Sequence, residues 1–112
     1  MNRSWAVTPE KIDAAIDRVI EAAHPRRVIL FGSAAHGKAG VPNDVDLLVV
    51  SKREIKHPRK ESVRIRRVLR GIPMPMDILV ISERRLQELT HQPGLVYREA
   101  LRAGKVVYEA TK

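Results

Sequence analysis

The 112-residue sequence contains no cysteine, and only four of its residues are aromatic. The absence of cysteine excludes disulfide bonds and thiolate metal sites, so Asp, Glu and His remain as the side chains able to bind a metal ion. This set of ligands favours a hard cation such as Mg²⁺ over zinc.

Long apolar runs are also missing. No run approaches the roughly 20 residues that a membrane-spanning helix needs, and the first residues, MNRSWAVTPEK, lack the apolar core of a signal peptide. We therefore expect a cytoplasmic protein with no membrane partner. With 44% hydrophobic and 30% charged residues, the composition is that of a globular protein, and we expect a single domain over residues 1–112.

The net charge of +8 is concentrated in one segment. Residues 52–70 hold nine Lys or Arg against two Glu. Three interpretations stay open for this segment: docking of an acidic partner protein, a solvated helix face, or nucleic-acid binding. The segment has no aromatic residue, which argues against the stacking surface of a single-strand binder. The candidate docking residues are Arg59, Arg64, Arg66, Arg67 and Arg70.

Local patterns predict an α/β domain in which helices pack against a small mixed β-sheet. Thr8 and Pro9 are typical of a helix start, and Ser82 is expected to cap a later short helix. We expect Val63, Ile65, Val68 and Leu69 to face the core, and Trp5 to anchor the N-terminus by packing. The predicted order is a helix ending before Pro25, strands at 27–31 and 45–50, a helix at about 58–70, a strand at 76–81, a short helix, a helix at 95–103 and a strand at 106–108.

Two aspartates stand at the beginning of the apolar stretch in FGSAAHGKAGVPNDVDLLVV. Asp44 and Asp46 are two residues apart, so in a strand their carboxylates project from the same face and repel each other unless a cation lies between them. Asp77 opens another apolar strand, where an unpaired ionised carboxylate is costly. If strands 45–50 and 77–81 are neighbours, the three acids converge and could hold two Mg²⁺ ions.

A Gly-Ser pair precedes the aspartates. Gly32 and Ser33 end the strand at 27–31, where backbone N–H groups can face an anion and glycine lets a phosphate approach the backbone closely. The loop that follows is long enough to bring Gly32, Ser33 and the acids to one edge of the sheet. We therefore expect a phosphate site beside the metal site.

These motifs carry a family resemblance that covers nearly the whole chain. Phe31-Gly32-Ser33, ten intervening residues, Asp44-Val45-Asp46-Leu47 and the later Asp77 resemble the signature of the DNA polymerase β-type nucleotidyltransferase superfamily. The closing sequence PGLVYREALRAGKVVYE resembles the minimal nucleotidyltransferase (MNT) subgroup. The resemblance implies that Gly32 and Ser33 bind the triphosphate of ATP and that Asp44, Asp46 and Asp77 are catalytic ligands of two Mg²⁺ ions. It also implies that Asp77 is the base for the acceptor hydroxyl.

The same resemblance implies a function. Such an enzyme moves a nucleoside monophosphate, AMP in the simplest case, from a nucleoside triphosphate to a hydroxyl and releases pyrophosphate. Because the chain is too short to contain an acceptor-binding domain, we expect another protein to present the hydroxyl. Relatives resemble the antitoxin of a toxin–antitoxin pair whose partner is an all-helical HEPN ribonuclease, which implies a hetero-oligomer and adenylylation of a tyrosine. Two alternatives stay open: a non-catalytic module that masks a partner ribonuclease, and an antibiotic-type enzyme that modifies a small-molecule hydroxyl.

Overall fold

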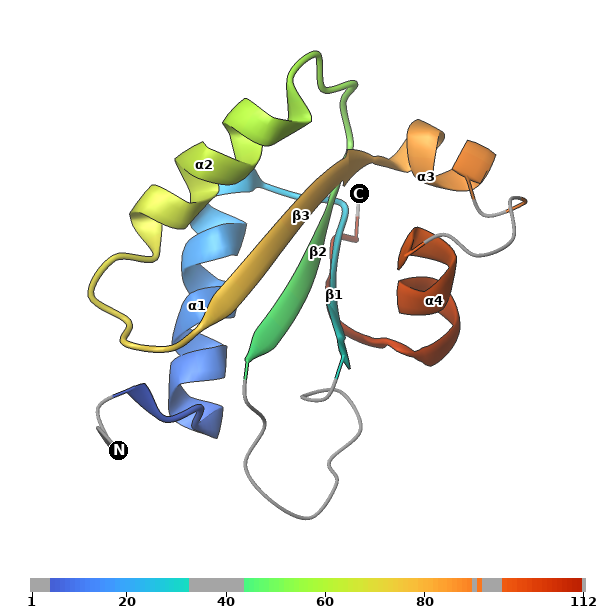
Figure 1. Cartoon of the computed structure of the whole chain (residues 1–112). Coiled ribbons are helices and arrows are strands. Elements are labelled where there is room, and N and C mark those ends of the chain that lie inside the picture. Colours follow the sequence, from blue (N-terminus) through green and yellow to red (C-terminus); the bar gives the residue numbers. More distant parts are fainter. Residues whose placement is uncertain (1–4, 33–43, 90, 92–95, 112) are drawn as a thin grey trace.

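The computed structural model describes residues 5–32, 44–89, 91 and 96–111. Its helices and strands follow the predicted order (Figure 1). They are α1 (Pro9–Ala23), β1 (Arg27–Phe31), β2 (Val45–Ser51), α2 (Pro58–Val68), β3 (Met76–Ser82), α3 (Glu83–Leu89), α4 (Val96–Ala103) and β4 (Lys105–Glu109). The predicted α/β class with a small mixed sheet is confirmed.

The four strands form one sheet in the order β3-β2-β1-β4. β2 and β3 are parallel, whereas β1 is antiparallel to both β2 and β4. Asp46 lies directly opposite Phe31 of β1 on one side and opposite Asp77 of β3 on the other. The predicted pairing of the two aspartate-bearing strands is therefore present, and β3 is an edge strand of this sheet.

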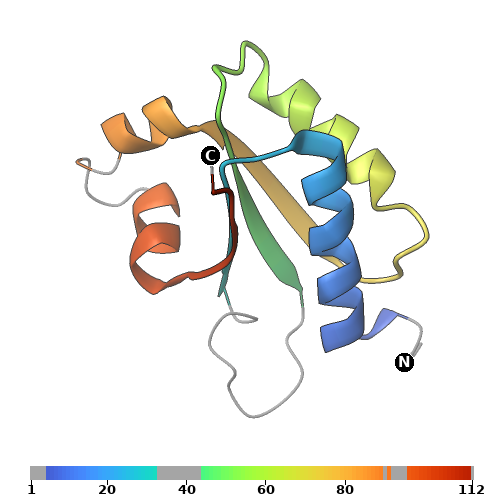
Figure 2. The ribbon, with the colours of Figure 1, turned by 180° about the vertical axis from the view of Figure 1, so that it is seen from behind.

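Helices cover both faces of the sheet, which explains the nearly continuous apolar sequence of β2. Because side chains alternate along a strand, Val45 and Leu47 pack beneath α1 and α2, whereas Leu48 and Val50 pack beneath α3 and α4. The view from behind shows the two helix pairs on opposite sides of the strands (Figure 2).

Capping residues fix the helix ends as the sequence predicts. The Thr8 hydroxyl accepts a hydrogen bond from the Lys11 backbone N–H at 3.2 Å, and Pro9 occupies the first turn of α1. The Ser82 hydroxyl accepts one from the Arg85 N–H at 3.1 Å at the start of α3. Each such cap satisfies a donor that has no partner within its own helix.

α2 differs from the prediction in its end and in its buried face. The helix ends at Val68, where the Arg18 guanidinium Nη1 donates to the carbonyl oxygens of Val68 at 3.2 Å and Arg70 at 2.7 Å. Ile65 is fully buried, but Val63 is 44% exposed and Val68 38% exposed. The expectation that these two valines face the core is wrong, because α2 lies along the sheet edge and buries only a narrow stripe.

Trp5 also departs from expectation. It is 55% exposed, so it is not a buried packing anchor for the N-terminus. Val7, two residues later, is buried and closes the core above α1 instead.

Among the described residues, no helix is long and apolar enough to cross a membrane.

Gly104, between α4 and β4, offers a test of the packing of α4 on the sheet. A Cβ there would meet the Ala100 carbonyl oxygen and would lie 2.7 Å from Cγ2 of Ile29. We expect Gly104→Ala to lower the free energy of unfolding by about 1–3 kcal/mol, as overpacking does, measured by urea denaturation. Arg102→Ala, at an exposed position of α4, should change it by less than about 0.5 kcal/mol; an equal loss in both variants would contradict this account.

Candidate active site

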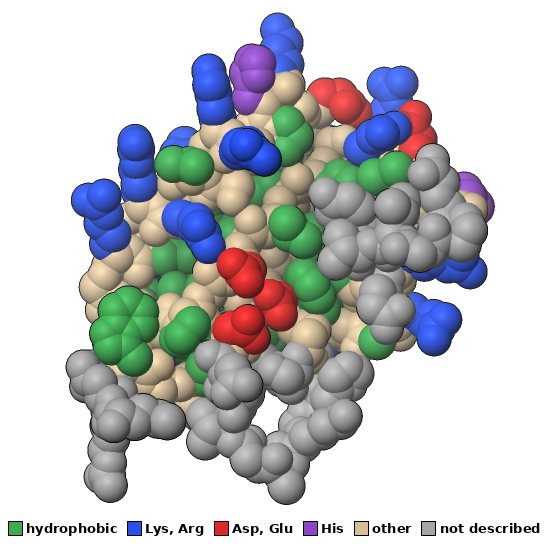
Figure 3. Space-filling view, in the orientation of Figure 1, with side chains coloured by type: hydrophobic (Ala, Val, Ile, Leu, Met, Phe, Trp, Pro, Cys, Tyr) green, Lys and Arg blue, Asp and Glu red, His purple; other side chains and the backbone are tan. Residues whose placement is uncertain are grey.

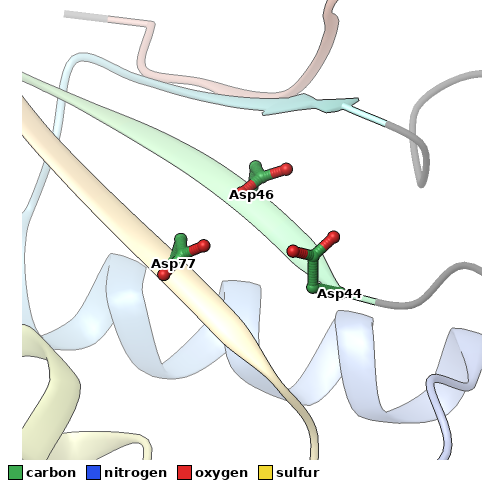
Figure 4. A group of neighbouring side chains, drawn as sticks. All are labelled: Asp44, Asp46 and Asp77. Atoms are coloured by element: carbon green, nitrogen blue, oxygen red, sulfur yellow. The ribbon is translucent and has the colours of Figure 1, made fainter.

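Three carboxylates meet on the face of the sheet that α3 and α4 cover only in part. Asp44 immediately precedes β2, Asp46 is its second residue, and Asp77 is the second residue of β3. One oxygen of each carboxylate can be chosen such that all three lie within 4.8 Å of one another. Figure 4 shows the three side chains on the same face of the two strands.

The local sequence explains this arrangement. Asp44 and Asp46 share a face because side chains alternate along β2, and the parallel register brings Asp77 opposite Asp46. Farther along the same face, Leu48 and Ile81 are buried beneath α3 and α4. The acids therefore occupy the end of a face whose other end is apolar core.

The cluster opens into a hollow of about 370 Å³. Phe31 and Leu79 line it together with Asp46 and Asp77, and Arg66 of α2 forms part of its wall. Asp77 is the most open of the three acids, with 64% of its side chain exposed. A ligand entering this hollow therefore meets Asp77 before the half-buried Asp46.

The electrostatics of the cluster favour a cation. Burial raises the pKa of the Asp46 carboxyl above its ordinary value, and the neighbouring charges of Asp44 and Asp77 raise this pKa further. A hydrogen bond with the Asp77 side chain acts in the same direction. All of these effects penalise the ionised form of Asp46, and a bound cation would remove the penalty.

Three carboxylates fit the two Mg²⁺ ions expected from the sequence, because each Mg²⁺ prefers oxygen ligands and often binds to proteins through one or two carboxylates. The predicted metal residues Asp44, Asp46 and Asp77 are thus brought together, and they are the residues that would hold the ion.

Gly32 lies beside the cluster, as predicted for a phosphate site. Its φ is +73°, in the region that favours glycine, and a Cβ at this position would meet the Oδ2 of Asp46. Only glycine therefore fits between the end of β1 and the Asp46 carboxylate. Ser33, the other predicted nucleotide-binding residue, lies outside the described residues.

Arg66 is a site residue that the sequence did not assign to the acids. Its Nη2 lies 3.3 Å from Oδ1 of Asp77 and donates to the Met76 carbonyl oxygen at 2.9 Å. The sequence grouped it with the basic residues expected to dock a partner. No sequence signal indicated this contact, because it depends on how α2 lies against β3; Ser62, four residues earlier, also reaches β3.

The other basic residues of α2 do not contact the acids. Arg64 is bound within the chain, since it forms a bidentate ion pair with Glu61 and donates to the Ala22 carbonyl oxygen. Arg59, Arg67 and Arg70 are exposed, and the proposed docking role of all these arginines remains a prediction.

A comparison with protein families adds an independent finding. A family model described as "Polymerase beta, Nucleotidyltransferase" matches residues 13–112, which is most of the chain. The chain belongs to this nucleotidyltransferase family. A comparison with curated proteins found no match. Membership supports nucleotidyl transfer as the general activity of this nucleotidyltransferase, and the family generally uses a nucleoside triphosphate with Mg²⁺.

A pair of glycine variants tests the role of Gly32 in the nucleotidyltransferase. Gly32 and Gly71 have φ angles of +73° and +93°, so alanine at either position carries a backbone penalty of about 1–2 kcal/mol. Only at Gly32 would the Cβ also meet Asp46; at Gly71 the nearest atom is Arg18 Nη1, 3.9 Å away.

We expect both variants to melt at lower temperature, and only Gly32→Ala to lose the rise in Tm caused by ATP with Mg²⁺. The measurement is differential scanning fluorimetry across an ATP series. If ATP raises the Tm of Gly32→Ala as much as that of the wild type, the absence of a side chain at Gly32 is not needed for ATP binding.

The raised pKa of Asp46 predicts how the metal-free protein responds to pH. Because the folded state holds the Asp46 proton more tightly than the unfolded state does, this carboxyl contributes stability that is present below its unfolded pKa. That stability is lost as the pH rises through the raised folded pKa. Glu61, whose pKa the Arg64 guanidinium lowers, acts in the opposite direction in every variant, so the comparison with Asp46→Asn isolates Asp46. We expect the Tm of the wild type in EDTA to fall across this range relative to that of Asp46→Asn, and this relative fall to be smaller in Mg²⁺. If the Tm of the wild type and that of Asp46→Asn change with pH by the same amount, the pH dependence comes from other groups.

Proposed function

We propose that the chain is a Mg²⁺-dependent nucleotidyltransferase that moves AMP from ATP to a hydroxyl on a partner protein. The observation that carries the proposal is the convergence of Asp44, Asp46 and Asp77 from two neighbouring strands to within 4.8 Å. Family membership supports the transfer in general; the choice of ATP and of a protein acceptor rests on the resemblance to minimal nucleotidyltransferases.

The chain's own residues have distinct parts in this reaction. The resemblance assigns the triphosphate to Gly32, whose missing side chain lets the Asp46 carboxylate lie against the end of β1. Asp77, the most exposed acid, accepts the proton of the acceptor hydroxyl. The acceptor oxygen forms a bond to the α-phosphorus while the bond from this phosphorus to the bridging oxygen breaks, and pyrophosphate leaves. When bound, Mg²⁺ at the three aspartates supplies positive charge for the triphosphate and the leaving pyrophosphate.

The resemblance to the MNT subgroup supports a finer proposal about the partner. The acceptor would be a tyrosine of a helical HEPN-type ribonuclease, and its adenylylation would neutralise that toxin. The exposed arginines of α2 support a partner with an acidic surface, because opposite charges speed association and fix the orientation of the complex.

Label transfer tests the proposed reaction. With ATP labelled at the α-phosphate, we expect Mg²⁺-dependent label on a co-expressed HEPN-type protein, and no label from γ-labelled ATP. Asp46→Asn should lower the transfer at least about a hundredfold, the scale of losing one electrostatic contact to the transition state. Asp17→Asn, on the exposed face of α1, is the matched control and should transfer normally.

A thermal measurement separates binding from chemistry. ATP at about 100 times its dissociation constant stabilises by ~2.7 kcal/mol, which is a rise in Tm of roughly 10 °C for a domain of this size.

In the label-transfer assay, undiminished labelling by Asp46→Asn would contradict the metal assignment. If the chain inhibits the ribonuclease without labelling it, the proposed enzyme is wrong and the chain acts as a non-catalytic binding module.

A further inference from the structure

A second hollow, of about 590 Å³, adjoins the acidic site at the N-terminal end of β3. Leu69, Met74 and Met76 give it an apolar lining, with Trp5 on one side and Arg66 and Arg70 at its rim. Arg66 lines this hollow and the acidic one alike, so the two are neighbours. We call it the Trp5 hollow.

Trp5 is held at this position by the fold. The Lys11 ammonium donates to the carbonyl oxygens of Ala6 at 2.8 Å and Pro73 at 2.9 Å, which ties the residue after Trp5 to the segment that leads into β3. A tryptophan that is 55% exposed leaves apolar surface in water. Tryptophan in such a place is typical of binding surfaces, where it offers a large rigid contact area.

The rim of the Trp5 hollow is positively charged. Arg66 near the end of α2 and Arg70 in the turn that follows the helix both line the hollow, and both are exposed. Arginine forks suit carboxylates, which they bind through two parallel hydrogen bonds. In Figure 3 the acidic side chains gather in the middle of the face, with hydrophobic side chains beside them and Lys and Arg over α2.

We propose that the Trp5 hollow binds the acceptor polypeptide through an acidic segment that carries an apolar or aromatic side chain. The apolar side chain packs against Trp5 and Met76, and the carboxylates pair with Arg66 and Arg70. Because Arg66 lies 3.3 Å from Asp77, a segment held there brings a neighbouring hydroxyl to the base. The identification as an acceptor site rests on the proposed function.

The geometry favours this occupant over the nucleotide and over nucleic acid. Gly32 follows β1 and the hollow adjoins β3, so β2 with Asp46 separates the expected triphosphate position from the hollow. Of the described residues that line the hollow, Trp5 alone is aromatic, and the floor is aliphatic and thioether. Single-stranded nucleic acids instead stack successive bases on several aromatic rings.

Trp5 is the only tryptophan of the chain, so its fluorescence reports occupancy of the hollow directly. The probe is a short synthetic peptide of Glu, Leu and one Tyr, titrated at low salt without ATP or Mg²⁺, under excitation selective for tryptophan. We expect a saturable shift of the emission to shorter wavelength as the indole is buried, and weaker binding at about 1 M salt, where charges are screened.

Charge-reversal variants give the matched comparison. Arg70→Glu should weaken binding of the peptide at least about tenfold, since it removes a charge-assisted hydrogen bond to the peptide and sets a like charge in its place. Arg67→Glu makes the same charge change three residues earlier, at an exposed position of α2 that does not line the hollow. This variant should bind within about twofold of the wild type.

Several outcomes would overturn the assignment. They are an unchanged emission with the acidic peptide, an equal shift with a peptide in which Lys replaces Glu, and equal losses in Arg67→Glu and Arg70→Glu. A shift with a short RNA but not with the acidic peptide would assign the hollow to nucleic acid instead. The titration contains no ATP or Mg²⁺, so a negative result contradicts the peptide-binding proposal only. Nucleotidyl transfer is tested separately by the label-transfer assay.

Discussion

The parallel register of β2 and β3 is the constraint on which the site depends, because it sets Asp46 directly opposite Asp77. Like charges facing each other across two strands are destabilising. The rest of the register opposes this cost, since the aliphatic residues that follow in both strands, from Leu47 and Ile78 onward, are buried except for the partly buried Leu79. Each fully buried aliphatic side chain contributes about 1.5–3 kcal/mol, and a slip of one residue would turn all of them to the wrong face.

The strand order makes β3 an edge strand, and α2 protects that edge. The Ser62 hydroxyl donates to the Ile78 carbonyl oxygen at 2.8 Å, and Arg66 donates to that of Met76 at 2.9 Å. An exposed strand edge invites pairing with other chains, so these two side chains satisfy acceptors that a further strand would otherwise use. Arg66 therefore serves the fold and the site at once, because the same nitrogen reaches Asp77.

Much of the architecture could be predicted because its signals are local. The spacing of Asp44 and Asp46 and the caps at Thr8 and Ser82 depend on residues within a few positions of one another, and the apolar runs on either side define the strands. Asp77 could be added because a lone acid in an apolar strand requires an explanation.

The missed features depend on tertiary placement. Val63 and Val68 fit a helical apolar pattern, yet they are exposed because α2 lies at the edge of the sheet. Trp5 is a large apolar residue of the kind expected in a core, but it is exposed. Lys11 donates to the carbonyl oxygens of its neighbour Ala6 and of the distant Pro73, which fixes this position. No sequence period reveals that Arg66 reaches Asp77, since that contact requires the angle at which α2 crosses β3.

The proposed acceptor site depends on a residue outside the family motif, because Arg66 of α2 contacts Asp77. The site residues form a row across the sheet from β1 to α2. The row begins with Gly32, continues with the carboxylates of Asp46 and Asp77, and ends with the guanidinium of Arg66. An acceptor that approaches Asp77 along the edge of β3 passes Arg66 first. The guanidinium attracts acidic groups and repels basic ones. For the proposed acceptor, charge would therefore be selected at Arg66 before the hydroxyl reaches Asp77, so the proposal assigns the reaction to the motif and the choice of acceptor to the end of α2.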